Sequence, residues 1–144
     1  MKRILTLFAL CFFLGGCATT SLSSLQRRSI EAKELEGNFD DAYKASITVL
    51  QDKGFVIKHT DYNSGVIEAE TGIKPGFWTN SNTVVTACIE TFSKDRIKER
   101  VTFMNQYDDG WGTRSSKIIE EPKFLQEIYD AIQKEMFVRK NLNK

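Results

Sequence analysis

The most regular pattern of apolar positions in the chain follows Gly37 and Asn38. Apolar and small side chains recur there at helical spacing along one stripe, at Phe39, Ala42, Tyr43, Ser46, Ile47 and Leu50. Asn38 can cap the first turn, with Asp41 three residues later in a variant of the capping box. Gly54 can supply the left-handed residue that ends such a helix. The pattern therefore predicts a helix over residues 39–53.

Elsewhere the apolar positions alternate with polar ones, which is typical of half-buried strands. Asp61 to Gly65 is rich in residues that favour turns, so the strands on either side of it form a hairpin. Two longer strands follow and join near Asp95. The predicted strands are residues 29–36, 55–59, 66–71, 83–92 and 97–106.

The pairing of the two long strands can be predicted from their side chains. If the numbers of opposed residues sum to 190, Ile89 faces Val101 on one side of the sheet. The same register sets Ala87 opposite Phe103 on that face, and Glu90 opposite Arg100 on the other. A slip of one residue would oppose two glutamates and mix the faces, so we expect the first register.

Glycine-rich segments at 72–82 and 106–117 are expected to be loops. Pro122 suits the first position of a C-terminal helix, whose apolar stripe is Leu125, Ile128, Ile132 and Met136. Residues 139–144 form a polar tail. The order predicts a single two-layer α+β domain over residues 29–138, with a mostly antiparallel sheet of about four to five strands and two helices packed on it.

Residues 1–16 have the composition of a secretory signal peptide. Lys2 and Arg3 precede about ten mostly apolar residues, and small residues follow. A membrane-spanning helix needs about 20 apolar residues, and this run is shorter. The alternative is a buried N-terminal element of a cytosolic fold, which the Ser/Thr-rich stretch directly after the run disfavours.

The sequence Leu14-Gly15-Gly16-Cys17 resembles the lipobox of bacterial lipoproteins. The resemblance implies cleavage before Cys17 and lipidation of its thiol and new α-amine, which anchors a protein stably because several acyl chains are attached. Ala18, rather than Asp, follows the cysteine, and in the pattern of enteric bacteria this implies transport to the outer membrane, facing the periplasm. Residues 17–28 would then be the lipidated cysteine and a flexible tether.

A second resemblance covers the helix and hairpin at residues 43–70. Its Leu-Gln-Asp-Lys-Gly-Phe run, followed by Asp61-Tyr-Asn-Ser-Gly65-Val-Ile-Glu-Ala, is similar to a pattern in small Gram-negative lipoproteins. A comparable helix-and-sheet unit occurs in the domains of BamC, a lipoprotein of the outer-membrane barrel-assembly machinery. The resemblance implies a fold. It supplies no catalytic residue and transfers no partner.

Charge and cysteine content narrow the classes of function. Of the 20 basic residues the leader carries Lys2 and Arg3, which leaves 18 against 19 acidic residues. No basic excess remains to favour nucleic acid. Loss of Cys11 and lipidation of Cys17 would leave Cys88 alone, so no disulfide within the chain can form.

We find no constellation of residues that indicates catalysis or a metal site. His59 is the single histidine, and we expect a structural role on a strand. Glu68 and Glu70 share one strand face, most simply a solvated one, although they could hold a hard cation weakly. No cofactor or metal is expected.

Aromatic residues in the two glycine-rich loops are the remaining signal. Trp78 and Trp111 would leave the same end of the long hairpin, so we expect them close together. The candidate binding surface comprises Phe77, Trp78, Tyr107, Trp111 and Arg114, and its mixture of rings and a cation suits a peptide or another envelope protein. The alternative is that the rings cover one end of the core.

The sequence thus predicts a lipid-anchored envelope lipoprotein that acts as a non-enzymatic binding or accessory module. An envelope hydrolase with an unrecognised site is the alternative.

Overall fold

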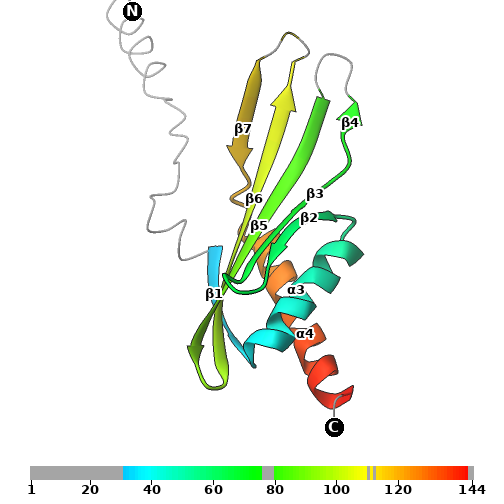
Figure 1. Ribbon diagram of the computed structural model, residues 1–144. Helices are drawn as coiled ribbons and strands as arrows, with labels where there is room; N and C mark the ends of the chain where they lie inside the picture. Colours follow the sequence, from blue (N-terminus) through cyan, green and yellow to red (C-terminus); the bar gives the residue numbers. More distant parts are fainter. Residues whose placement is uncertain (1–30, 76–79, 110, 112, 143–144) are drawn as a thin grey trace, which may run out of the picture.

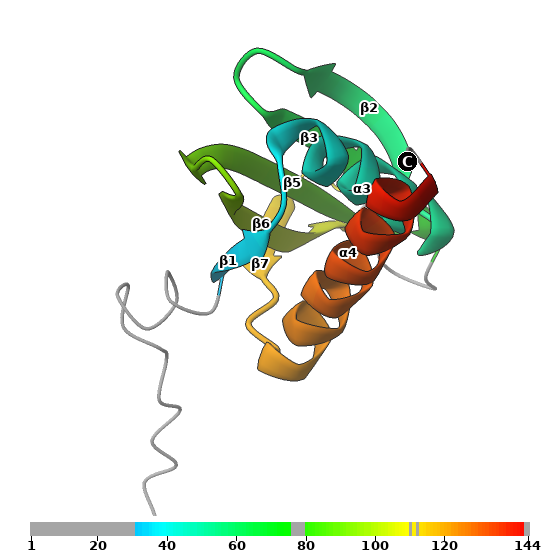
Figure 2. The same cartoon turned by 90° about the horizontal axis from the view of Figure 1, so that it is seen from below.

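The protein is an α+β domain in which two helices pack on one face of an antiparallel sheet (Figures 1 and 2). The computed structural model describes residues 31–75, 80–109, 111 and 113–142. The helices are α3 (Phe39–Asp52) and α4 (Pro122–Leu142). The strands are β1 (Ala32–Glu36), β2 (Val56–Asp61), β3 (Val66–Glu70), β4 (Lys74–Pro75), β5 (Asn80–Ser93), β6 (Arg96–Asp108) and β7 (Arg114–Ile118).

The sheet has seven strands, so the expected number of four to five is too low. Its main order is β1-β6-β5-β3-β2, with β4 added beside β5 and β7 added beside β6. Both added strands come from segments that were expected to be loops. The reason lies in β5 and β6, which are 14 and 13 residues long and extend well past their main neighbours. The unpaired backbone at their far ends is satisfied by β4 and β7.

Helix α3 begins and ends as its sequence predicts. The side-chain carbonyl of Asn38 accepts a hydrogen bond of 2.8 Å from the backbone N–H of Asp41. Gly54 adopts a φ of +85° directly after the last turn. Helix α4 starts at Pro122 as expected but continues to Leu142, into the segment expected to be a tail. There Arg139 pairs with Glu135 at 2.9 Å and donates a hydrogen bond to Thr48 of α3.

The register of β5 and β6 differs by two residues from the prediction. Opposed residue numbers sum to 188, so Ala87 lies opposite Val101 and Glu90 opposite Lys98. The observed loop is the pair Lys94 and Asp95, a two-residue hairpin connection that sets Ser93 opposite Arg96, a sum of 189. An irregularity between Thr91 and Ser93 then restores the even sum. A shift of two preserves the faces, and the predicted inward side chains are therefore correct.

The core lies between the helices and the inward face of the sheet. The largest fully buried side chains include Tyr129, Phe103, Leu50, Ile67, Ile89, Ile97, Leu125, Ile128 and Ile132. The ring of Phe103 packs at 4.9 Å from that of Phe124 and at 5.7 Å from that of Phe55, which joins α4 and the start of β2 through the sheet.

A tyrosine completes the sheet where β6 changes neighbours. The β1 pairing ends at Arg100 and the β7 pairing begins at Met104. Between them the Tyr129 hydroxyl accepts a hydrogen bond of 3.0 Å from the Val101 N–H and donates to the Glu31 carbonyl. Helix α4 thus supplies a partner that neither strand provides.

Candidate functional site

The end of the sheet formed by β4, β5, β6 and β7 projects beyond both helices (Figure 1). The pairs Pro75 with Asn80 and Asp108 with Arg114 close the two strand connections at this end. Asn80 in turn lies opposite Asp108, so the two connections leave the sheet side by side. The prediction that both aromatic loops share one end of the hairpin is therefore correct for the residues that flank them.

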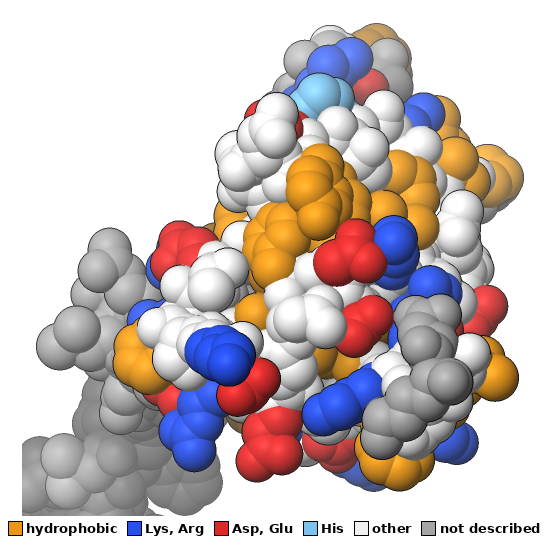
Figure 3. All heavy atoms as spheres, turned by 60° about the horizontal axis from the view of Figure 1, so that its bottom comes forward, with side chains coloured by type: hydrophobic (Ala, Val, Ile, Leu, Met, Phe, Trp, Pro, Cys, Tyr) orange, Lys and Arg blue, Asp and Glu red, His pale blue; other side chains and the backbone are white. Residues whose placement is uncertain are grey.

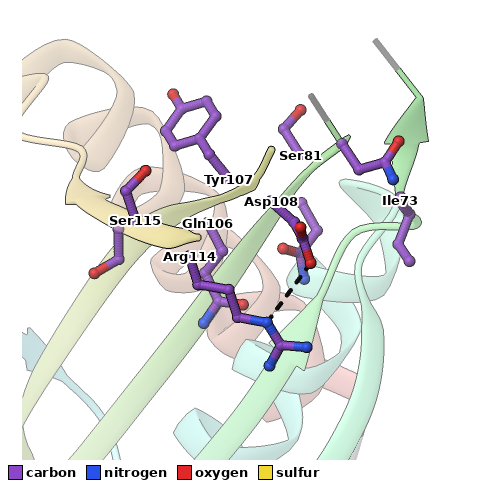
Figure 4. A pocket seen from close by; sticks show the side chains of 10 residues that line it. Ile73, Ser81, Gln106, Tyr107, Asp108, Arg114 and Ser115 are labelled. Carbon is purple, nitrogen blue, oxygen red and sulfur yellow. Dashed lines mark ion pairs between the residues drawn. The ribbon is translucent and has the colours of Figure 1, made fainter. Parts of the chain in front are cut away.

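A hollow of about 450 Å³ lies at this end of the sheet (Figure 4). Nine of its ten lining residues carry a polar side chain, Ile73 being the exception; the nine are Asn80, Ser81, Asn82, Gln106, Tyr107, Asp108, Arg114, Ser115 and Ser116. Because every second residue of a strand points to the same face, the hollow receives the side chains at even positions of β5, β6 and β7. These point away from the face that the helices cover.

Tyr107 and Arg114 line this region but point to opposite faces of the sheet. Arg114 lies opposite Asp108 and forms an ion pair with it at 3.6 Å. Tyr107 is on the other face (Figure 4). Its hydroxyl accepts a hydrogen bond of 3.4 Å from the Asn105 side chain. The expected surface that combines both side chains is therefore divided by the sheet.

Trp111 is 90% exposed and does not cover the core. Its backbone position is fixed by Asp109, whose carboxylate accepts hydrogen bonds from the N–H groups of Trp111 at 2.9 Å and Thr113 at 3.0 Å. These hydrogen bonds, the one from Trp111 first, hold the pKa of the Asp109 carboxyl below its ordinary value. The turn thus holds a large flat ring in solvent, three residues along the chain from Asp108 and from Arg114, which line the hollow.

Three predicted site residues, Cys17, Phe77 and Trp78, lie outside the described residues. The predicted proximity of the two tryptophans stays a prediction for the same reason. The sequence analysis missed the carboxamides at the hollow, Asn80, Asn82 and Gln106, because it assigned the first two to a loop. The sequence feature that could have identified the two asparagines is that Asn80, Ser81 and Asn82 directly precede the predicted strand and continue its two-residue period.

The other candidate groups lie elsewhere. His59 is exposed and opposes Glu68, because an irregularity between Ile57 and His59 turns it away from the face expected for it. Glu70 forms an ion pair with Lys58 at 2.8 Å. Cys88 is a free thiol, half-buried on a central strand. Among the residues that the structure describes, no three His, Cys, Asp or Glu side chains are placed to hold a metal ion.

The opposite end of the molecule has a different surface. On the face seen in Figure 3, acidic and basic side chains alternate, and hydrophobic side chains form a small patch between them. An aromatic cluster of Phe39, Tyr43 and Tyr62 joins α3 to the β2–β3 turn, with ring centroids 5.1 to 5.8 Å apart. These rings pack against one another.

No family model and no curated protein matches this chain. Within the part of the chain that the structure describes, no helix is both long enough and apolar enough to cross a membrane.

Proposed function

We propose that this protein is a membrane-anchored envelope lipoprotein that acts as a non-enzymatic binding module through the projecting end of its sheet. The anchor is the lipidated Cys17, and the expected location is the periplasmic side of the outer membrane. The proposal for the anchor rests on the sequence Leu14-Gly15-Gly16-Cys17 and the leader before it.

The observation that supports a binding role is Trp111, an almost fully exposed indole in the connection between β6 and β7, whose flanking residues Asp108 and Arg114 line the hollow. An exposed tryptophan presents a large flat apolar area, and tryptophan is enriched among the residues that carry binding energy at interfaces. The hollow is formed by the ends of strands that project beyond both helices (Figure 1). Rigid strands hold the lining side chains in place, which reduces the entropy lost on binding.

The test is recovery of envelope components by the lipidated protein after cross-linking, with three chains compared. These are the natural chain, Trp111→Ala, and the double variant Trp78→Ala/Trp111→Ala. A matched control, Phe92→Ala/Phe137→Ala, removes exposed rings at other places, where the side chains are 61% and 67% exposed.

We expect both tryptophan variants to lose the recovered component while the control retains it. Because Trp111 is 90% exposed, its removal should leave the melting temperature within about 3 °C of the natural value. Unchanged recovery by both tryptophan variants would contradict the proposal.

A further inference from the structure

The lining of the hollow forms two rows of polar side chains that cross β5, β6 and β7. In one row Gln106 stands between Asn82 and Ser116, and in the next Asp108 stands between Asn80 and Arg114. Directly opposed residues of antiparallel strands project from the same face, so all six side chains share one surface (Figure 4). Ile73, which directly precedes β4, is the apolar residue at the end of the first row.

The carboxamides in these rows have unused hydrogen-bonding capacity. The side chains of Asn80, Asn82 and Gln106 form no hydrogen bond with another described residue. Each carboxamide offers two N–H donors and one acceptor oxygen. A ligand that covers them must supply both donors and acceptors, because each buried group left unpaired costs about 1–3 kcal/mol. Alcohols and amides meet this requirement, whereas hydrocarbon does not.

We infer that the hollow binds a glycan built of N-acetylated amino sugars, an inference that rests on the proposed binding role of this end of the sheet. An acetamido group presents an N–H and a carbonyl to Asn82 and Gln106, and its methyl group can pack on Ile73. Ring hydroxyls are paired by Asn80 and Ser116. The exposed indole of Trp111 offers a flat surface for the apolar face of a neighbouring sugar ring.

A peptide also carries amides, but the geometry favours the glycan. An extended peptide gains most of its hydrogen bonds by adding a strand to an open sheet edge, where backbone groups are available. The hollow lies on a sheet face, between strands whose backbone groups already pair with one another. The hydroxyl and acetamido groups that branch from a sugar ring match this array of side chains better than the linear backbone of a peptide does.

The test is a titration of the full chain, ¹⁵N-labelled and purified in detergent, with a tetramer of β-1,4-linked N-acetylglucosamine. We expect the side-chain amide resonances of Asn80, Asn82 and Gln106 to shift. The variant Asn82→Ala/Gln106→Ala should bind at least tenfold more weakly, since it removes two sets of hydrogen bonds. The matched control Asn63→Ala/Gln51→Ala removes the same groups from exposed positions away from the hollow and should bind as the natural chain does.

Two further probes decide the ligand class. Maltotetraose has the hydroxyls but not the acetamido groups, and we expect it to bind about tenfold more weakly; equal binding overturns the assignment of the acetamido group. An acetylated tetra-alanine peptide should leave the hollow resonances unmoved. If the peptide shifts them and the sugars do not, the glycan inference is wrong while the proposed binding role stands. If no probe shifts them, the glycan inference is wrong; if both tryptophan variants also still recover envelope components, the proposed binding role fails as well.

Discussion

At the scale of single residues, the most unusual feature is a carboxyl group in the core. Glu99 is fully buried on the inward face of β6, beside helix α3. Its Oε1 atom lies 2.7 Å from the Ser46 hydroxyl, which is also 2.8 Å from the Ala42 carbonyl oxygen. One hydroxyl proton cannot serve both oxygens. A protonated Glu99 satisfies the geometry, because it donates to Ser46 while Ser46 donates to Ala42.

Burial raises the pKa of the Glu99 carboxyl to about 7, although the hydrogen bond from Ser46 acts in the opposite direction. In the unfolded chain the ordinary pKa is 4.5. Between pH 4.5 and about 7, the folded protein therefore keeps a proton on Glu99 that the unfolded chain has lost. The contribution of Glu99 to the free energy of unfolding is greatest below pH 4.5, falls as the pH rises towards 7, and is lower by roughly 3 kcal/mol above that pH.

Glu99→Gln should remove this pH dependence. The glutamine amide has nearly the same shape and can donate to Ser46 without ionising. We expect the variant to unfold at a higher denaturant concentration than the natural chain at pH 8, and at a similar concentration at pH 4.5. Urea titrations at both pH values measure the difference. A natural chain whose stability is the same at both values, or a variant destabilised at pH 8, would show that Glu99 is not a neutral acid in the fold.

At the scale of elements, the contact between the β2–β3 turn and β5 depends on a glycine. Gly65 adopts a φ of +69°, and its carbonyl accepts a hydrogen bond of 2.9 Å from the Ile89 N–H. A Cβ atom at this position would lie 2.1 Å from the Ile89 carbonyl oxygen. The hairpin can therefore join the sheet only while residue 65 lacks a side chain.

Gly65→Ala should destabilise the protein more than Gly54→Ala does. Both residues have a positive φ, so both variants lose about 1 kcal/mol to backbone strain. No atom lies within 4 Å of a Cβ at Gly54, and only the variant at Gly65 must also displace β5 or the turn. We expect a further loss of about 2 kcal/mol or more, visible as a lower melting temperature. Equal losses in the two variants would mean that the turn moves freely.

The elements that the sequence predicts well have local signals. Asn38, Gly54 and Gly65 fix the ends of α3 and the first hairpin, because caps and turns depend on residues adjacent in the chain. The strands β4 and β7 were missed because pairing with the ends of β5 and β6 stabilises them, and their own residues have no alternating pattern of apolar side chains. The register was missed by two residues because the bulge near Phe92 has no distinctive sequence. The sequence could place Trp111 and Arg114 at one end of the long hairpin, whereas the opposite faces of Tyr107 and Arg114 depend on their pairing through β7, which it did not predict.

At the scale of the whole molecule, the position of the proposed anchor relative to the hollow matters for binding. The chain enters the sheet at Ala32, opposite Arg100 in β6. The hollow lies at Asp108, eight residues further along that strand, which is about 27 Å at the usual rise of a strand. The tether predicted at residues 17–28 would span roughly 18 Å on average as a coil. An anchored domain with its sheet pointing away from the membrane would therefore present the hollow clear of the lipid headgroups.

The last prediction concerns this anchor. Cys17→Ala removes the thiol that the lipobox resemblance assigns to lipidation, so the chain should remain an uncleaved precursor without acyl groups. Cys88→Ala is the matched control, since it removes a half-buried thiol from the sheet and should leave processing unchanged. Mass spectrometry of both variants and of the natural chain measures the N-terminus and the added acyl mass. A natural chain that begins at another residue, or carries no lipid on Cys17, would refute the proposed lipid anchor. The hollow would then remain a candidate binding site of a protein without that anchor.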